Sequence, residues 1–296
     1  MTAGVDRTKF LGGSDVAAIL GVSPWRNRVD LWADKITPRV EDTTNVAAKR
    51  RGHRLEPYIL DMIREEHGLE IIRANERYID VAIPFLAAEI DAEYSDGDQA
   101  QNIEIKTVHP FKAKEWGDIG TDSLPLHYIA QVQHGLGVTG RDICKVFALI
   151  GDELKPYTVT RDDELIRVMR EQCVEFWNRY VVPKMQPPID YEAKNVLDTL
   201  KRLYPGTDGT VIDATAMHDH WRAVYETASD MVRKYEGILD GAKAHLLAEM
   251  GQACAIEFSD GRAFVRKEIK KKAYVVEHAA SKYIDFRLGK LKEKSE

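Results

Sequence analysis

The sequence predicts an α/β fold, in which a central mixed β-sheet is flanked by helices. Five segments with strand-like patterns alternate with segments of helical periodicity between residues 14 and 182. A proline-rich break at 183–188 interrupts both periodicity and composition. Mixed strands covered by helices indicate one α/β core. We therefore predict a core over residues 1–188 and a mainly helical accessory region with a β-hairpin over 189–296.

Three helices are expected before the first strand. Ser14 is a suitable N-cap for a short helix that ends at Gly21. Ser23-Pro24 predicts the start of a second helix, in which Trp25 and the apolar residues after it form a buried stripe. A third helix is predicted over 49–67, with Pro57 in or near its first turn.

The remaining core elements follow from alternation and helical periodicity. Strands are expected at 77–83, 86–94, 102–108, 144–150 and 155–160, with helices at 125–137 and 162–182. In the accessory region, helices are predicted over 191–204 and 214–250. A hairpin is expected where 253–258 and 262–269 flank Ser259-Asp260-Gly261, leading into Lys270-Lys271-Lys272.

The segment Ile103-Glu104-Ile105-Lys106 carries the chemistry of greatest interest. Residues two apart in a strand share a face, so Glu104 and Lys106 project together while the two isoleucines face the core. Antiparallel pairing with the preceding strand would bring Asp91 close to Glu104. Two carboxylates and a lysine on a rigid sheet can hold a hard divalent cation such as Mg²⁺ or Mn²⁺ against a phosphate. Charged residues on a solvent-facing strand are the alternative interpretation.

Composition narrows the class of protein. The 296 residues carry a formal charge of −6 and three widely spaced cysteines, which argues against a disulfide framework or a zinc site. We expect a cytoplasmic protein without a membrane partner, because no apolar run reaches membrane-spanning length and no signal segment is evident. Binding to nucleic acid would then depend on a locally basic surface.

The motifs together resemble the PD-(D/E)XK nuclease superfamily and, within it, the phage lambda exonuclease and YqaJ-type viral recombinase family. The resemblance spans about residues 7–185. It is carried by Arg7, Gly12-Gly13-Ser14-Asp15, Gly21-x-Ser23-Pro24-Trp25, Arg51-Gly52, Leu55-Glu56-Pro57, Ile90-Asp91, Glu104-Ile105-Lys106 and Tyr128-x-Ala130-Gln131-Val132-Gln133. Two positions depart from the family pattern: Ala92 replaces a glycine, and Glu89 stands where a small residue is common. Glu89 either adds a carboxylate to the metal site or is simply exposed.

The resemblance implies a restriction-endonuclease-like core and a metal-dependent active site. It assigns one or two Mg²⁺ ions, replaceable by Mn²⁺, to Asp91, Glu104 and the backbone carbonyl of Ile105. Glu56 would contact a metal directly or through water. It further implies that Lys106 orients the attacking water and that Gln131 positions the lysine or a phosphate.

The resemblance also implies a DNA-binding surface. Arg7 and Ser14 match a pair that binds the terminal 5′-phosphate, although capping by Ser14 and a surface position for Arg7 are equally good interpretations. The basic run that includes Arg51 and Arg54 precedes Glu56, and its alternative is a solvated helix face.

The implied function is digestion of double-stranded DNA from a 5′ end, leaving 3′ single strands for phage-type recombination. An annealing protein would be the partner, and a ring of three copies would thread the DNA. Three alternatives remain open: an endonuclease, a single-strand nuclease, and a nuclease-like DNA-binding module without turnover. Closed circular DNA distinguishes the first of these from an end-dependent enzyme.

Overall fold

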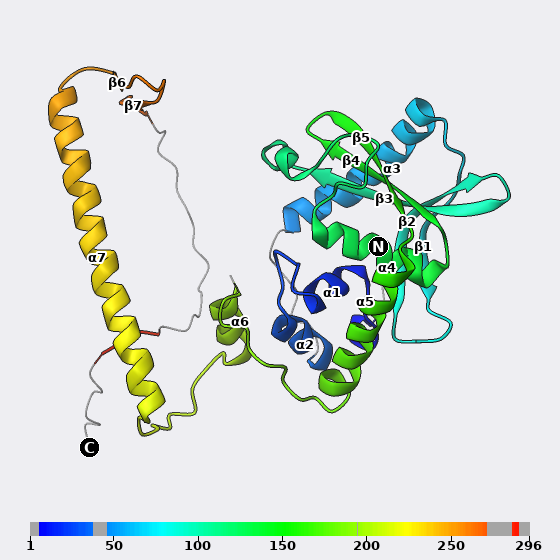
Figure 1. The fold of residues 1–296 in the computed structure, drawn as a ribbon, viewed down its shortest axis with the longest axis horizontal. Helices are drawn as coiled ribbons and strands as arrows, with labels where there is room; N and C mark the ends of the chain where they lie inside the picture. The colour runs from blue at the N-terminus through cyan, green and yellow to red at the C-terminus, as the bar shows by residue number, and fades with distance from the viewer. Residues whose placement is uncertain (1–5, 38–45, 194, 271–285, 290–296) are drawn as a thin grey trace. The chain divides into compact units, whose positions relative to one another are not determined.

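The computed structural model describes residues 6–37, 46–193, 195–270 and 286–289 (Figure 1). The chain divides into two compact units, Met1–Tyr204 and Pro205–Glu296, which are treated separately below. The side chain of Lys49 and the residues Lys271 and Lys272, which belong to two predicted basic runs, lie outside the described part. None of the described helices is long and apolar enough to cross a bilayer.

The first unit is built on a five-stranded sheet. Its strands follow chain order, and all neighbours are antiparallel except β3 and β4, which are parallel. The predicted mixed sheet is therefore confirmed. Gly97, at the tip of the β2–β3 hairpin, has a positive φ of 61°, a conformation that glycine adopts without steric cost. The strands are β1 (Ile71–Ile79), β2 (Ala87–Asp96), β3 (Gln99–Val108), β4 (Ile143–Ile150) and β5 (Glu153–Thr160).

Helices cover both faces of the sheet. On one face, Ile59 and Ile63 of α3 (Val46–His67) pack against Ile103 and Ile105 of β3. On the other face, Val132 and Leu136 of α4 (Leu126–Thr139) pack against β4 and β5. A 3₁₀ helix, η2 (Pro110–Glu115), and α4 lie in the crossover that parallel pairing of β3 and β4 requires. This alternation leaves Glu104 facing α4, since its neighbours in β3 face α3.

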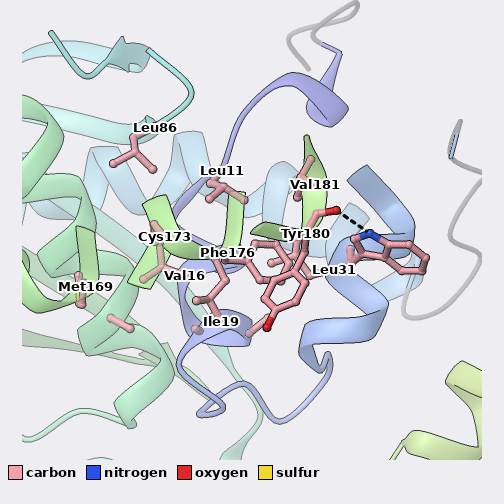
Figure 2. Packing of buried hydrophobic residues seen from close by; sticks show 14 of the residues in the cluster. Leu11, Val16, Ile19, Leu31, Leu86, Met169, Cys173, Phe176, Tyr180 and Val181 are labelled. Atoms are coloured by element: carbon pink, nitrogen blue, oxygen red, sulfur yellow. Dashed lines mark hydrogen bonds between the residues drawn. The ribbon is translucent and has the colours of Figure 1, made fainter. Parts of the chain in front are cut away.

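A further apolar cluster joins the N-terminal elements to the last helix of the core. Leu11, Val16 and Leu31 pack against Phe176 and Tyr180, as Figure 2 shows. The indole N–H of Trp32 donates to the Tyr180 carbonyl at 3.0 Å, which fixes the two ends of the unit together. The elements are η1 (Arg7–Lys9), α1 (Gly13–Ile19), α2 (Arg28–Ile36) and α5 (Asp163–Phe176), which continues as a π-helical turn, η3 (Trp177–Val181).

Two predicted helix starts are wrong. Ser14 is not an N-cap, because Gly12 occupies that position and Ser14 lies in the first turn of α1. The second helix begins at Arg28, where the Asn27 side chain accepts from the backbone N–H of Asp30 at 2.9 Å. Trp25 therefore precedes the helix and is 57% exposed, whereas the sequence placed it in the core. The first strand also begins six residues earlier in the chain than predicted, at Ile71, and ends four residues earlier, at Ile79.

Helix α6 (Val196–Leu203) belongs to the first unit, which ends at Tyr204 instead of at the predicted position 188. The buried carboxylate of Asp30 in α2 accepts from the Thr199 hydroxyl at 2.6 Å and from the guanidinium of Arg202. These contacts explain the difference, because the proline-rich segment interrupts regular structure without ending the packed unit.

The second unit contains one long helix and a small hairpin. Helix α7 (Ala216–Met250) ends where Gly251 takes a positive φ of 53°, and β6 (Ala255–Glu257) pairs antiparallel with β7 (Ala263–Val265). Arg266, just after the hairpin, donates to the Gly251 carbonyl. The predicted long helix and the hairpin are both present.

Candidate active site

The β2–β3 hairpin and α4 bring four of the predicted site residues together. Asp91 Oδ2 accepts from the backbone N–H of Ile105 at 2.7 Å, which fixes this carboxylate beside β3. Glu104 and Lys106 form an ion pair on the α4 side of the sheet. The side-chain amide of Gln131 also donates to Glu104 Oε1, at 2.6 Å. Two carboxylates, one amine and one amide thus share a single small volume.

Burial and mutual repulsion change the acidity of these carboxyls. Burial, aided by the charges of Asp91 and Glu56, raises the pKa of Glu104 to about 7 despite the neighbouring Lys106. Burial also raises the pKa of Asp91, against the attraction of Lys106 and the hydrogen bond from Ile105. Lys106 has its pKa raised, because the two carboxylates outweigh its own burial. The cluster therefore holds excess negative charge that a cation would stabilise.

Glu56 approaches the same cluster from α3. Burial and the charge of Asp91 raise its pKa, and His53 Nδ1 lies 3.7 Å from Oε2. Its other oxygen, Oε1, is buried without a hydrogen-bond partner. A buried acceptor without a hydrogen-bond partner is costly, and the charge of Glu56 also interacts with those of Asp91 and Glu104, so its unpaired oxygen favours a positive ligand.

The predicted phosphate-binding pair lies beside the cluster. A bridge between Leu11 and Leu86 places the N-terminal segment along the start of β2. A cavity of about 140 Å³ is then lined by Arg7 and Ser14 together with Glu104 and Gln131. The structure thus brings two of the four predicted DNA-binding residues to the predicted catalytic group.

Glu89 faces Arg7 across this cavity. The Arg7 guanidinium lies 3.6 Å from Glu89 Oε2, and both side chains are partly exposed. The structure agrees with the second interpretation of Glu89, because this residue is exposed and pairs with Arg7. The charge of Glu89 still contributes to the raised pKa of Asp91.

The buried Lys35 holds the N-terminal segment that carries Arg7. Lys35 Nζ donates to the carbonyls of Arg7 and Phe10 at 2.7 and 2.6 Å, and to Asp15 Oδ2 at 2.7 Å. Asp15 also accepts from Arg26 at 3.1 Å. Burial disfavours the ionised Asp15, but the Lys35 and Arg26 cations outweigh it and lower the pKa of Asp15. The position of Arg7 therefore depends on buried polar contacts.

Arg51 and Arg54 are not brought into the cluster. Both lie exposed on α3, within about one and a half turns before Glu56. They offer positive charge on the surface near the site, while His53 is the residue of this run that faces Glu56.

Sequence reasoning missed three residues around the site. The pattern gives no role near the site to Lys35, and it gives His53 only a place in a basic run. Tyr128 places its ring 5.2 Å from Lys106 Nζ, in a cation–π contact. Tyr128 lies one helical turn before Gln131, so the shared face of α4 was an available signal.

The oxygen-rich donor set fits a divalent cation, although no metal-ready cluster is preassembled. In the described residues, no three His, Cys, Asp or Glu side chains converge as a metal site. Asp91 and Glu104 are engaged by Ile105, Lys106 and Gln131. The unpaired oxygen of Glu56 is a hard ligand of the kind that such a cation prefers, and a bound cation would offset the repulsion and burial that raise the pKa values of these carboxyls.

Comparison with known proteins shows which family part of the chain resembles. Residues 5–142 match the model of the YqaJ-like viral recombinase domain. This part of the chain is thus similar to a YqaJ-like viral recombinase domain. The match confirms the resemblance drawn from the sequence, and the matched range contains every predicted site residue. The uncharacterized protein YqaJ of Bacillus subtilis (strain 168) is 31% identical over 216 residues, which span 72% of this chain and 66% of that protein. The chain thus spans just under two thirds of the length of this YqaJ relative.

Two solved structures are also similar to the YqaJ-like chain. The alkaline exonuclease LHK-Exo of Laribacter hongkongensis, in complex with dAMP, is 21% identical with a TM-score of 0.49, covering 67% of this chain and 94% of that one. A phage related exonuclease from Haemophilus somnus 129PT is 14% identical with a TM-score of 0.42, covering 59% and 96%.

Proposed function

We propose that this protein is a metal-dependent deoxyribonuclease that digests double-stranded DNA from 5′ ends. Its ion is Mg²⁺, which Mn²⁺ can replace, and its products are mononucleotides and 3′ single strands. These strands serve recombination of the phage type by annealing. The family match supports the recombination context, and the site supports hydrolysis of a phosphodiester.

One observation carries the proposal: Asp91, Glu104 and Lys106 meet on adjacent strands, with Gln131 reaching them from α4. Asp91, Glu104 and Glu56 are the groups that would hold the ion, with the Ile105 carbonyl as a further oxygen. When bound, a divalent cation lowers the pKa of water and neutralises charge on the reacting phosphate.

The chain's own residues perform the remaining tasks. The Lys106 ammonium, held by Glu104, hydrogen-bonds and orients the attacking water and stabilises the charge that develops on the phosphate. Gln131 fixes the Glu104 carboxylate, so the acid and the amine keep one geometry. Arg7 and Ser14 hold the terminal 5′-phosphate in the adjoining cavity, and Arg51 and Arg54 attract the backbone of the duplex.

The experiment is digestion of a 5′-phosphorylated linear duplex, with label at one end, in the presence and absence of Mg²⁺. We expect loss of mononucleotides from the 5′ end and a residual 3′ single strand. A closed circle of the same sequence should resist, and Lys106→Met should be inactive on both.

Each competing function predicts a different result. Cleavage of the circle indicates an endonuclease, and digestion of single strands alone indicates a single-strand nuclease. Retention of the duplex without cleavage, in either metal, indicates a binding module. Any of these three outcomes refutes the proposal.

A further inference from the structure

Helix α7 exposes a continuous apolar stripe. Ten of its large apolar or aromatic side chains are between 43% exposed, at Val224, and 63% exposed, at Met217; all but Leu247 lie in the stripe. Its ion pairs lie elsewhere on the helix and join near neighbours, as Arg233 joins Asp230 and Lys243 joins Asp240. An amphipathic helix of 35 residues whose apolar face no described residue of its own unit covers needs a partner for that face.

The spacing of the stripe is that of a coiled coil. Eight positions follow a strict alternation of four and three residues: Met217, Trp221, Val224, Ala228, Met231, Tyr235, Ile238 and Ala242. Four more apolar residues widen the stripe along one edge: Tyr225, Val232, Leu239 and Leu246. A period of seven over this length indicates that the covering partner is another helix of the same kind.

Side-chain sizes determine the direction of pairing. In a parallel pair, Trp221 and Tyr235 would each meet their own copy, and the intervening alanine layers would leave voids that cost stability. In an antiparallel pair, one register matches all eight positions: Trp221 with Ile238, Ala228 with Met231, Tyr235 with Val224, and Ala242 with Met217. Each alanine then meets a long methionine, and each aromatic ring meets a β-branched side chain. The layers have even volume throughout.

Charge and area agree with this arrangement. None of the twelve stripe positions carries a charge, so two copies meet without repulsion. Side chains of this size, about half exposed, offer on the order of 90 Å² each, and nine of them roughly 800 Å² per chain. That is about the area that each partner contributes to a stable interface.

We propose that α7 is a dimerisation helix, which pairs antiparallel with α7 of a second copy of this chain about a two-fold axis. The pairing is isologous, so assemblies built through it contain an even number of chains. This property is independent of the proposed nuclease function. If the first units form a ring of three copies, for example, pairing through α7 would join two such rings into an assembly of six chains.

The first test is the mass of the intact protein by light scattering. The unmodified chain should form an even-numbered assembly, and Met231→Lys should halve its mass, because it places a charge in the central layer. Lysine and methionine have similar helix propensities, so helix content by circular dichroism should not change. The control is Glu226→Lys, an equal helix substitution outside the stripe, which should leave the mass unaltered. An odd-numbered assembly, a monomer, or equal masses for both variants would overturn the proposal.

The second test reports direction and does not depend on a destabilised variant. Cys254 is exposed and is first replaced by serine, whereas Cys144 and Cys173 are buried. Ala242→Cys and Met217→Cys proteins should form a disulfide with each other after mixing and refolding, and neither should do so alone. The two copies of residue 242 would be about 37 Å apart in the antiparallel register. Cross-linking of either variant to itself indicates a parallel pair, and no cross-link in the mixture indicates that another surface covers the stripe; both refute the proposal.

Discussion

Gly13 lies directly against Gln131: a β-carbon added at Gly13 would stand 2.7 Å from Cγ of Gln131 and 3.3 Å from its backbone. No heavy atom tolerates that approach, so α1 can contact α4 this closely only with glycine at the contact. The same amide side chain holds Glu104. The position of α1 therefore influences, through Gln131, how the Glu104 carboxylate is held.

Gly13→Ala should consequently reduce nuclease activity by roughly tenfold to a hundredfold, because the displaced Gln131 no longer holds Glu104. Activity on linear duplex and thermal stability should be measured together. Gly21→Ala is a useful control for the backbone, because Gly21 has no neighbour within 4 Å but a positive φ of 73°. It should lower stability without lowering activity. Unchanged activity of Gly13→Ala would argue against a role for Gln131.

Lys106→Met should abolish most of the activity while DNA binding persists. Loss of one amine that stabilises the transition state typically costs on the order of 10²–10³ in rate. The side chain is largely buried, and methionine is close to lysine in length but lacks the ammonium that contacts Glu104 and the Tyr128 ring. Binding of a 5′-phosphorylated duplex in the absence of metal is the accompanying measurement. Digestion at the parental rate would remove Lys106 from the mechanism.

Lys35→Met should destabilise the first unit by about 3 kcal/mol, because it leaves Asp15 and two backbone carbonyls buried with fewer donors. Urea unfolding is the measurement. Lys9→Met is the matched control, since Lys9 pairs with Asp6 at the surface and should change stability by less than about 0.5 kcal/mol. Equal effects of the two substitutions would contradict the structural role of Lys35.

The pKa of Glu104 near 7 predicts a pH-dependent response to metal. Without metal, the folded state keeps a proton on Glu104 between its ordinary pKa of 4.5 and about 7, whereas the unfolded state loses it. This contribution to stability is therefore complete below about 4.5 and disappears as the pH rises through about 7. A divalent ion must displace that proton, so the rise in melting temperature caused by Mg²⁺ or Mn²⁺ should grow as the pH increases from about 6 to 8.

Glu104→Gln is the control for that measurement, because it cannot be deprotonated. Its melting temperature should respond weakly to metal, with no trend over this pH range. An identical pH trend in the parent and the variant would assign the effect to another group.

The sheet and the central acidic cluster could be predicted because they depend on local patterns. Alternation in β3 and a glycine turn after Asp96 determine the hairpin, and the hairpin places Asp91 beside Glu104. The approximate positions of the strands along the chain and of the helices at 125–137 and 162–182 follow from periodicity in the same way.

Contacts between distant segments could not be predicted in the same way. Lys35 looks like an ordinary surface residue in sequence, and only the folded chain shows its amine turned toward Arg7, Phe10 and Asp15. Trp25 has helical spacing from Val29, but Asn27 caps the helix after it. Tertiary hydrogen bonds of this kind leave no periodic signal, so helix starts and buried ion pairs are where the sequence was misleading.

The attachment of α6 to α2 has a practical consequence for anyone who wishes to isolate the first unit. A fragment that stops at the proline-rich segment would lack Thr199 and Arg202. The buried carboxylate of Asp30 would then lose two of its hydrogen-bond donors and its paired cation. Recombinant versions truncated after Tyr204 should stay soluble on expression, whereas those cut near 188 should accumulate in inclusion bodies.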